Sequence, residues 1–186
     1  MASVPNLSGL NASSDKIAAL LKARGHSVAI CEATSGGLIT ASLQGVSGAS
    51  SFMKGSLLLY TRNEYRHLPK EIRKRIIVDY SDPNFGPQKY RKSKENFVIQ
   101  MANYVREIYG ATYGLAESGA TEASRLGGKL RSSGAFTAVG IVGPSTTSTI
   151  VEVYDSPTND KRRENMLRYG NYALETFHRA LNLAHL

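Results

Sequence analysis

Short apolar segments alternate with amphipathic ones along most of the chain, and this alternation restricts the fold more than any other feature. Residues 14–24 carry apolar positions at helical spacing and end at Gly25, whereas residues 26–31 form a short apolar run typical of a buried strand. The change recurs after residue 93, where a helix ending at Gly110 precedes a strand at 111–117. The alternation predicts an α/β fold, a three-layer α/β/α sandwich with helices on both faces of a sheet.

The length of 186 residues suits one domain of about five strands and five helices. We divide the chain into a flexible N-terminal leader at residues 1–13 and a single domain at 14–186. Within that domain, residues 61–94 are predicted to form a solvent-facing excursion with a short basic helix at 69–76. The stretch 121–134 is predicted to be a polar loop.

The charge is unevenly distributed. The chain has 23 Lys and Arg against 15 Asp and Glu, a formal net charge of +8. Residues 62–94 alone hold ten basic and four acidic side chains. Because no recognition motif accompanies them, we do not expect nucleic acid as a partner. A solvated basic face, a contact between copies of the chain and an anionic ligand stay open.

Cysteine and histidine are scarce. Cys31 is the single cysteine, which excludes an intrachain disulfide, and the four histidines lack the spacing of a zinc site. The sequence also lacks an apolar run long enough for a membrane span and an export signal. We therefore expect a soluble, cytoplasmic protein with no metal, no cofactor and no membrane partner.

The stretch Cys31-Glu-Ala-Thr-Ser-Gly-Gly37 leads from a strand into a helix through small residues. Backbone N–H groups in such a turn, together with the positive end of the helix, can bind an anion or an oxyanion. The alternative is a turn that uses glycine only for its backbone angles.

Residues 32–37, followed by Gly48-Ala-Ser-Ser51, Phe52, Gly55 and Tyr60, resemble the Glu-Ser-Cys-Thr-Gly-Gly signature and following strand of the CinA C-terminal domain family. Residues 113–119 and the closing helix extend the resemblance over most of the chain. Bacterial members are nicotinamide mononucleotide deamidases. The resemblance implies metal-independent hydrolysis of a carboxamide by a serine assisted by lysine and tyrosine, and a homo-oligomer.

The residues that carry this activity are only partly present. The family's serine falls on Ala33, which cannot act as a nucleophile. Tyr60 matches the family's tyrosine, but the lysine position holds Tyr65, or Arg66 if one residue is inserted. In the family's third element Ser118 and Gly119 are retained, while Glu122 and Ala123 replace glycines that would approach a phosphate.

Candidate site residues lie at strand ends, where α/β proteins bind ligands. The catalytic candidates are Tyr60, Glu117, Ser118 and Glu32. The ligand-binding candidates are Ala33, Thr34, Ser35, Gly36, Gly37, Tyr65, Arg66 and Gly119. Carboxylates and phenols there predict acid/base chemistry on a small-molecule ligand, such as isomerisation, dehydration or cyclisation. The structural alternative is that the two glutamates cap backbone N–H groups or pair with arginines.

Three functions stay open at this stage. The first is a small-molecule enzyme in which acid/base chemistry replaces amide hydrolysis. The second is a non-catalytic pseudoenzyme that binds a ligand or partner. The third is residual nicotinamide mononucleotide amidohydrolase activity through Thr34 or Ser35.

Overall fold

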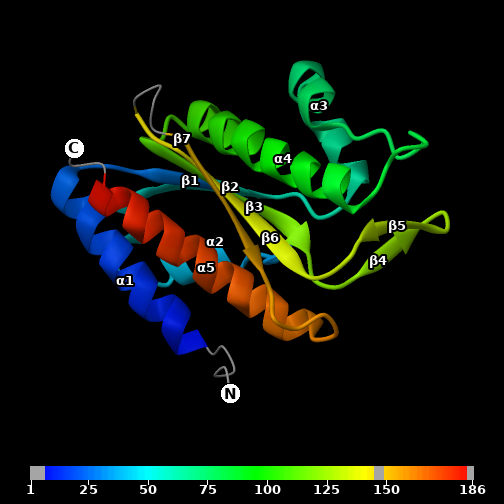
Figure 1. Cartoon of the computed structure of the whole chain (residues 1–186). Coiled ribbons are helices and arrows are strands. Elements are labelled where there is room, and N and C mark those ends of the chain that lie inside the picture. The colour runs from blue at the N-terminus through cyan, green and yellow to red at the C-terminus, as the bar shows by residue number, and fades with distance from the viewer. Residues whose placement is uncertain (1–6, 145–148, 184–186) are drawn as a thin grey trace.

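A mixed five-stranded sheet, ordered β2-β1-β3-β6-β7, forms the centre of the computed structural model, which describes residues 7–144 and 149–183 (Figure 1). β1 pairs in parallel with β2 and β3, and β6 pairs antiparallel with β3 and β7. The strands are β1 (Val28–Glu32), β2 (Met53–Leu58), β3 (Tyr113–Ala120), β6 (Phe136–Val142) and β7 (Thr149–Asp155). A separate hairpin consists of β4 (Ser124–Leu126) and β5 (Lys129–Ser132).

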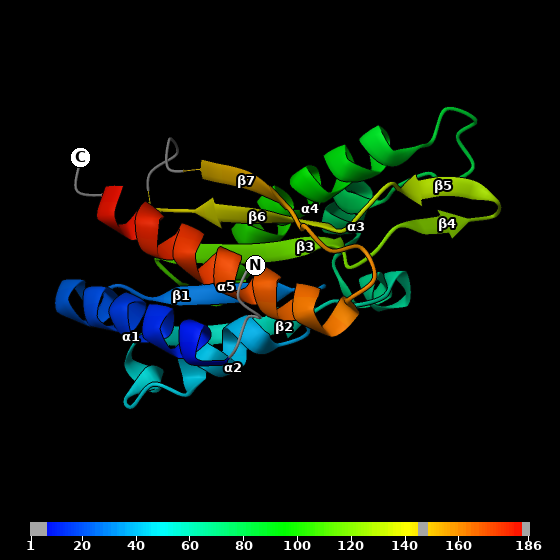
Figure 2. The ribbon, with the colours of Figure 1, turned by 60° about the horizontal axis from the view of Figure 1, so that its bottom comes forward.

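Helices cover both faces of the sheet, which confirms the three-layer α/β/α prediction (Figures 1 and 2). One face carries α1 (Leu7–Arg24), α2 (Leu38–Gln44) and α5 (Arg162–Leu183). The other carries α4 (Pro87–Ile108), with α3 (Lys70–Ile76) packed against α4. Two short 3₁₀ helices, η1 (Ala49–Ser51) and η2 (Arg62–His67), flank β2. None of the helices in the described ranges is long and apolar enough to span a membrane.

The alternation of side chains along β1 divides the core in two. Val28 and Ile30 pack into the cluster under α1, α2 and α5, whereas Ala29 and Cys31 pack into the cluster under α4. All four side chains are fully buried. Successive strand residues point to opposite faces, so a sheet covered on both sides needs the continuous apolar run that the sequence has here.

Helix α4 lies unusually close to the sheet at two glycines. A Cβ on Gly114 of β3 would lie 1.9 Å from the Ala102 carbonyl oxygen, and one on Gly140 of β6 would lie 2.7 Å from the Val98 carbonyl carbon. Both distances are far shorter than a van der Waals contact. The missing side chains therefore let the α4 backbone approach the strands directly.

Two boundaries differ from the prediction. Helix α1 begins at Leu7 instead of near Ser14, and Leu10 is fully buried, so residues 7–13 belong to the helix. Residues 1–6 of the predicted leader lie outside the described residues. The expected polar loop at 121–134 contains the β4–β5 hairpin, whose turn is formed by Gly127 and Gly128, both with positive φ. A pair of such glycines is the usual device of a tight hairpin turn.

Helix α4 also begins earlier than predicted, at Pro87 instead of residue 93. Proline is favoured in the first turn of a helix, because its fixed φ suits the helix and its missing N–H needs no partner there. The extra turn matters for function. It places Lys94 in the interior of a helix that packs against the sheet, instead of at the helix start.

Candidate functional site

The carboxylate of Glu32 lies at the end of β1 and caps the helix that follows. Its Oε2 accepts hydrogen bonds from the backbone N–H groups of Gly37 (3.0 Å) and Ile39 (3.1 Å), and its Oε1 accepts one from that of Thr40 (2.7 Å). The first N–H groups of a helix have no partner within the helix, and a negative charge is favourable beside them. Glu32, which is 1% exposed, therefore stabilises the start of α2.

Glu117 lies beside Glu32, because the two residues are paired in register on β3 and β1. Its Oε2 accepts hydrogen bonds from the N–H groups of Thr34 (3.0 Å) and Ser35 (2.8 Å), and its Oε1 accepts one from the Thr137 hydroxyl. Burial raises the pKa of Glu117 above its ordinary value, the hydrogen bonds from Thr137 and Ser35 oppose this, and the Glu32 carboxylate adds to the rise. The Ser35 hydroxyl lies between the two carboxylates, 2.7 Å from Glu32 and 2.8 Å from Glu117.

The turn between β1 and α2 is thus built around the protein's own anions. Five of its backbone N–H groups donate to the carboxylates of Glu32 and Glu117, so these groups are not available to an external anion. Gly36 and Gly37 have φ of 70° and 96°, a region that glycine occupies without steric cost. Of the two alternatives that the sequence leaves open, the structure favours capping of backbone N–H groups by the glutamates.

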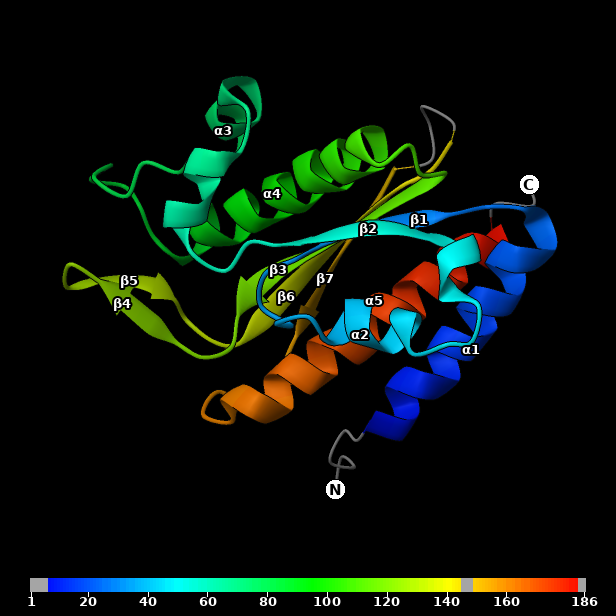
Figure 3. The ribbon, with the colours of Figure 1, turned by 180° about the vertical axis from the view of Figure 1, so that it is seen from behind.

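A cleft of about 470 Å³ lies on the other side of these strand ends. Its walls come from the ends of β1 and β3, the segment around η2, helix α4, the β4–β5 hairpin and the start of α5. Figure 3 shows the η2 segment and the hairpin at the same end of the molecule, beyond the sheet. The hairpin that the sequence predicts as a loop is therefore one wall of the cleft.

The cleft brings together half of the predicted site residues. Those that line it are Ala33, Thr34, Tyr60, Tyr65, Ser118 and Gly119. Those that do not are Glu32, Glu117, Ser35, Gly36, Gly37 and Arg66. Ser35 and the two glutamates are buried beneath the turn, and the exposed Arg66 guanidinium donates from Nε to the ring of the adjacent His67. The insertion of one residue that would align Arg66 with the family's lysine therefore places it outside the cleft.

The positions equivalent to the family's nucleophile offer little for nucleophilic attack. Ala33 lines the cleft with a methyl group and is 7% exposed. The Thr34 hydroxyl accepts a 2.6 Å hydrogen bond from the N–H of Gly119, which ties the β1 turn to β3. Ser35 is fully buried between the glutamates. A hydroxyl in either of these settings has no adjacent base facing the cleft.

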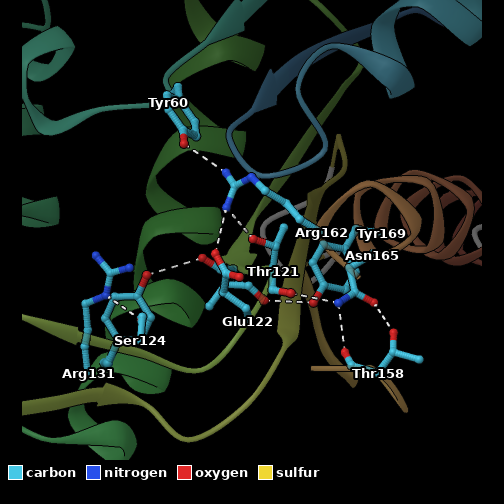
Figure 4. A network of polar contacts seen from close by, with 12 residues as sticks. Tyr60, Thr121, Glu122, Ser124, Arg131, Thr158, Arg162, Asn165 and Tyr169 are labelled. Carbon is cyan, nitrogen blue, oxygen red and sulfur yellow. Dashed lines mark hydrogen bonds and ion pairs between the residues drawn. The ribbon is translucent and has the colours of Figure 1, made fainter. Parts of the chain in front are cut away.

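Arg162, at the start of α5, connects several walls of the cleft mouth (Figure 4). Its guanidinium donates to the Tyr60 hydroxyl at 2.9 Å and to the Thr121 hydroxyl at 2.6 Å, and it lies 3.5 Å from the Glu122 carboxylate. Tyr60 is 61% exposed and lies two residues beyond the end of β2. The tyrosine retained from the family pattern therefore stands at the rim of the cleft.

Lys94 is the functional candidate that the sequence analysis misses. Its Nζ donates a 3.0 Å hydrogen bond to the Ser118 hydroxyl and lies 5.3 Å and 5.6 Å from the ring centroids of Tyr90 and Phe97. Burial lowers the pKa of Lys94 to about 8; the nearby Glu117 carboxylate acts in the opposite direction, and Arg131 lowers it further. A lysine with such a pKa is partly neutral at physiological pH and can accept a proton.

A signal for Lys94 is present in the sequence. Tyr90, Lys94, Phe97, Val98 and Met101 share helical spacing, so they lie on one face of α4. All except Lys94 are buried apolar or aromatic residues. Extending the apolar pattern back to Pro87 would have placed this lysine on the core-facing side of the helix.

The cleft is cationic. Four of its lining residues are basic, namely Arg62, Lys94, Arg131 and Arg162, and Glu122 is the one carboxylate among its described lining residues. The Arg62 guanidinium donates to the Val78 carbonyl, and that of Arg131 donates to the Ser124 hydroxyl. Within the part of the chain that the structure describes, neither arginine is paired with a carboxylate. Part of the basic excess noted in the sequence therefore faces this cleft.

Metal-binding side chains are not clustered. No group of three or more His, Cys, Asp or Glu side chains among residues 7–144 and 149–183 is arranged to hold a metal ion. Cys31 is buried, and burial raises the pKa of its thiol, with Glu117 and Glu32 adding to the rise. A thiol in this setting is a poor nucleophile.

Comparison with known proteins decides the family. The sequence model of the CinA C-terminal domain matches residues 10–181. The chain belongs to this family. A "CinA-like protein" of Salinibacter ruber is 30% identical over 99 residues, which cover 53% of this chain and 21% of that protein. The chain thus matches about a fifth of the length of this relative.

Solved structures of the CinA superfamily share the fold. A competence or damage-inducible protein from Enterobacter asburiae superposes with a TM-score of 0.70 at 15% identity, covering 92% of this chain and 98% of that chain. The competence damage-inducible protein A from Klebsiella pneumoniae gives 0.70 at 16% identity, with coverage of 95% and 98%. The competence/damage inducible protein CihA from Agrobacterium tumefaciens gives 0.66 at 19% identity, with coverage of 98% and 99%.

Proposed function

We propose that this CinA-family chain is a small-molecule enzyme that moves protons on an anionic substrate, with Lys94 as the base. The single observation that carries the proposal is the amine of Lys94 in a cationic cleft. Its Nζ is hydrogen-bonded to a neutral hydroxyl, and the pKa of about 8 leaves a usable neutral fraction near pH 7. A general base is most effective when its pKa lies near the working pH.

Other cleft residues supply the remaining parts of acid/base chemistry. Ser118 positions the amine by accepting its hydrogen bond. Burial raises the pKa of Tyr65, and it raises that of Tyr90 to about 12, so both phenols stay protonated and can only donate at neutral pH. Arg131 and Arg162 offer guanidinium groups suited to a carboxylate or phosphate. Glu32 and Glu117, in contrast, do not line the cleft, and their buried carboxylates hold the β1–α2 turn in place.

The geometry gives less support to residual amide hydrolysis. Hydrolysis through an acyl intermediate needs a nucleophile with a neighbouring base. Ala33 has no hydroxyl, Thr34 is bonded to Gly119, and Ser35 is buried between two carboxylates. We therefore rank nicotinamide mononucleotide hydrolysis through Thr34 or Ser35 below proton transfer.

The experiment that tests the proposal measures exchange of carbon-bound protons. Pyruvate and 2-oxoglutarate are incubated with the protein in D₂O, and loss of the signal of the protons beside the carbonyl is followed by ¹H NMR. Lys94→Met should reduce protein-dependent exchange by about 100-fold, within the usual contribution of a general base. Lys92→Met, on the same helix but exposed and paired with Glu95, should leave it unchanged.

Two results would count against proton transfer. Equal exchange in the wild type and in Lys94→Met would show that Lys94 is not the base. Exchange no faster than in buffer, combined with binding of the same anions, would instead favour the second candidate, a non-catalytic binding protein. The unpaired arginines of the cleft support that candidate as well, because they recognise an anion whether or not a reaction follows.

A further inference from the structure

Lys94 has an environment that differs from that of the other charged residues on its helix. Lys92 and Arg91, its neighbours in sequence, form ion pairs with Glu95 and Asp155. Lys94 has no carboxylate partner among the described residues and instead contacts a hydroxyl and two aromatic rings. Without an ion pair among the described residues, the burial of this amine outweighs the opposite effect of the nearby Glu117 carboxylate on its pKa.

A second cation contacts the same aromatic ring as this amine. The Arg131 guanidinium is 5.1 Å from the centroid of the Tyr90 ring, and Lys94 Nζ is 5.3 Å from the same centroid. Burial is the main cause of the lowered pKa of Lys94; the Glu117 carboxylate opposes it, and Arg131 lowers the pKa further. A desolvated lysine beside another cationic group is the arrangement that activates lysine as a nucleophile toward carbonyl carbon.

From this geometry we infer that Lys94 forms an imine with the carbonyl group of an oxo acid, while Arg131 binds the carboxylate of the same molecule. The inference rests on the proposed function, names its substrate class, and changes the role of Lys94 in that cleft from base to nucleophile. An oxo acid carries an electrophilic carbon and an anionic group a short distance apart. The lining of the cleft includes both an amine and a guanidinium, and each of them contacts the Tyr90 ring.

The chemical step needs no further reactant. The lone pair of the neutral Nζ attacks the carbonyl carbon, the C–N bond forms, and the carbonyl π pair moves to oxygen. A proton passes from nitrogen to that oxygen, giving a carbinolamine. The C–O bond then breaks as the oxygen takes a second proton and leaves as water, and loss of the remaining nitrogen proton gives the imine. Amine and carbonyl are thus converted to imine and water.

A hydroxyl is in place to move these protons. Tyr65 lines the cleft, and its ring is stacked on Phe97 at 5.8 Å, the same ring that Lys94 Nζ contacts. In the described ranges of the chain, its hydroxyl has no hydrogen-bond partner, whereas that of Tyr90 donates to the Gly119 carbonyl. Tyr65 is therefore the phenol available to protonate the leaving oxygen.

The test is reductive trapping of the imine. The full chain is incubated at pH 7.5 with pyruvate, 2-oxoglutarate or acetoacetate and sodium cyanoborohydride, and labelled lysines are located by peptide mass spectrometry. Labelling of Lys94 should exceed that of Lys92 at least about tenfold, because a larger fraction of its amine is neutral. Lys94→Arg keeps the positive charge but cannot form an imine, and the oxo-acid adduct should be absent at this position.

A second part of the experiment tests whether Arg131 binds the carboxylate of the oxo acid. Propanal, an uncharged carbonyl compound, is trapped in parallel. Arg131→Met should reduce labelling of Lys94 by the oxo acids about tenfold more than labelling by propanal, since it removes a charge-assisted hydrogen bond to the carboxylate.

The outcomes separate this inference from the proposed function. Trapping at Lys94 supports the imine. Lys94-dependent proton exchange with no trapped adduct from any of the three oxo acids overturns the imine and leaves proton transfer standing. If no adduct, no proton exchange and no binding are observed, both the imine and the proposed function are overturned. If Arg131→Met changes the labelling of Lys94 by the oxo acids no more than the labelling by propanal, the assignment of Arg131 to the carboxylate is overturned.

Discussion

Replacing Lys94 with methionine should stabilise the protein while it abolishes function. Lowering the pKa of Lys94 from 10.5 to about 8 corresponds to about 3 kcal/mol of cost for keeping the charge in the folded state. Methionine removes that cost and retains a similar unbranched chain on the apolar face of α4. It also removes the hydrogen bond to Ser118, which is worth about 1 kcal/mol. Allowing for solvent at the partly exposed side chain, we expect a net gain of about 1–2 kcal/mol in the free energy of unfolding at pH 7.

The pH dependence of the stability tests whether the charge of Lys94 causes this difference. The folded-state pKa lies below the unfolded one, so the cost is fully present below pH 8 and disappears as the pH rises toward 10.5. Between pH 7 and pH 9.5, the wild type should therefore gain about 2 kcal/mol relative to Lys94→Met. Urea unfolding at both pH values measures this difference. Lys92→Met, whose native side chain is 80% exposed, is the matched control and should change stability by less than about 0.5 kcal/mol at either pH.

Two results would refute this reasoning. A Lys94→Met variant that is less stable than the wild type at pH 7 would mean that the amine is a net stabilising contact. A stability difference independent of pH would mean that the charge of Lys94 is not desolvated, and the basis for its role as a base would be lost.

Two further predictions concern the framework of the site, and both can be measured by urea unfolding. Glu117→Ala should lower the free energy of unfolding by at least about 3 kcal/mol, because the N–H groups of Thr34 and Ser35 lose their buried acceptor. Glu117→Gln should lower it by less than half as much, since the amide oxygen can still accept a hydrogen bond. Equal losses in the two variants would contradict a capping role. Gly114→Ala should lower the free energy of unfolding by about 2–3 kcal/mol, because its Cβ would lie 1.9 Å from the Ala102 carbonyl oxygen. Gly86→Ala is the control and should change it little, because nothing lies within 4 Å of a Cβ there. A similar loss in both variants would show that the close approach of α4 is not the cause.

Much of the fold follows from local patterns. The strands at 28–32 and 136–142 and the buried face of α5, with Phe177 and Leu181, come from apolar runs and helical spacing that need no knowledge of neighbours. The errors lie at element ends, where local signals compete. Residues 7–13 are polar enough to suggest a leader, yet Leu10 is buried against the rest of the domain. Packing of this kind extends a helix beyond its local start signal.

The candidate site is less predictable than the fold. Glu32 ends β1 and Tyr60 follows β2, whereas Glu117 and Ser118 lie three and two residues before the end of β3. Position along a strand does not say on which side of the turn a side chain lies. Glu32 turns toward the α2 N-terminus and Glu117 toward the turn before it. Ser118 turns toward α4 and Tyr60 toward Arg162. The directions of Glu117, Ser118 and Tyr60 depend on partners more than twenty residues away in sequence, whereas the backbone N–H partners of Glu32 lie five to eight residues away.

The sequence alone determined the layered α/β architecture and the family, because both are written in local patterns of residues. Only the tertiary structure decided which of the basic side chains is desolvated at the cleft. Lys94 is one of ten basic residues between positions 62 and 94, and its helical spacing from buried apolar residues separates it from Lys92 only once the helix is known to begin at Pro87. Its pKa is lowered because α4 packs it against Ser118 and two aromatic rings, away from water and from any carboxylate partner in the described chain. Desolvation depends on what surrounds a group in space, and that is fixed only when the chain has folded.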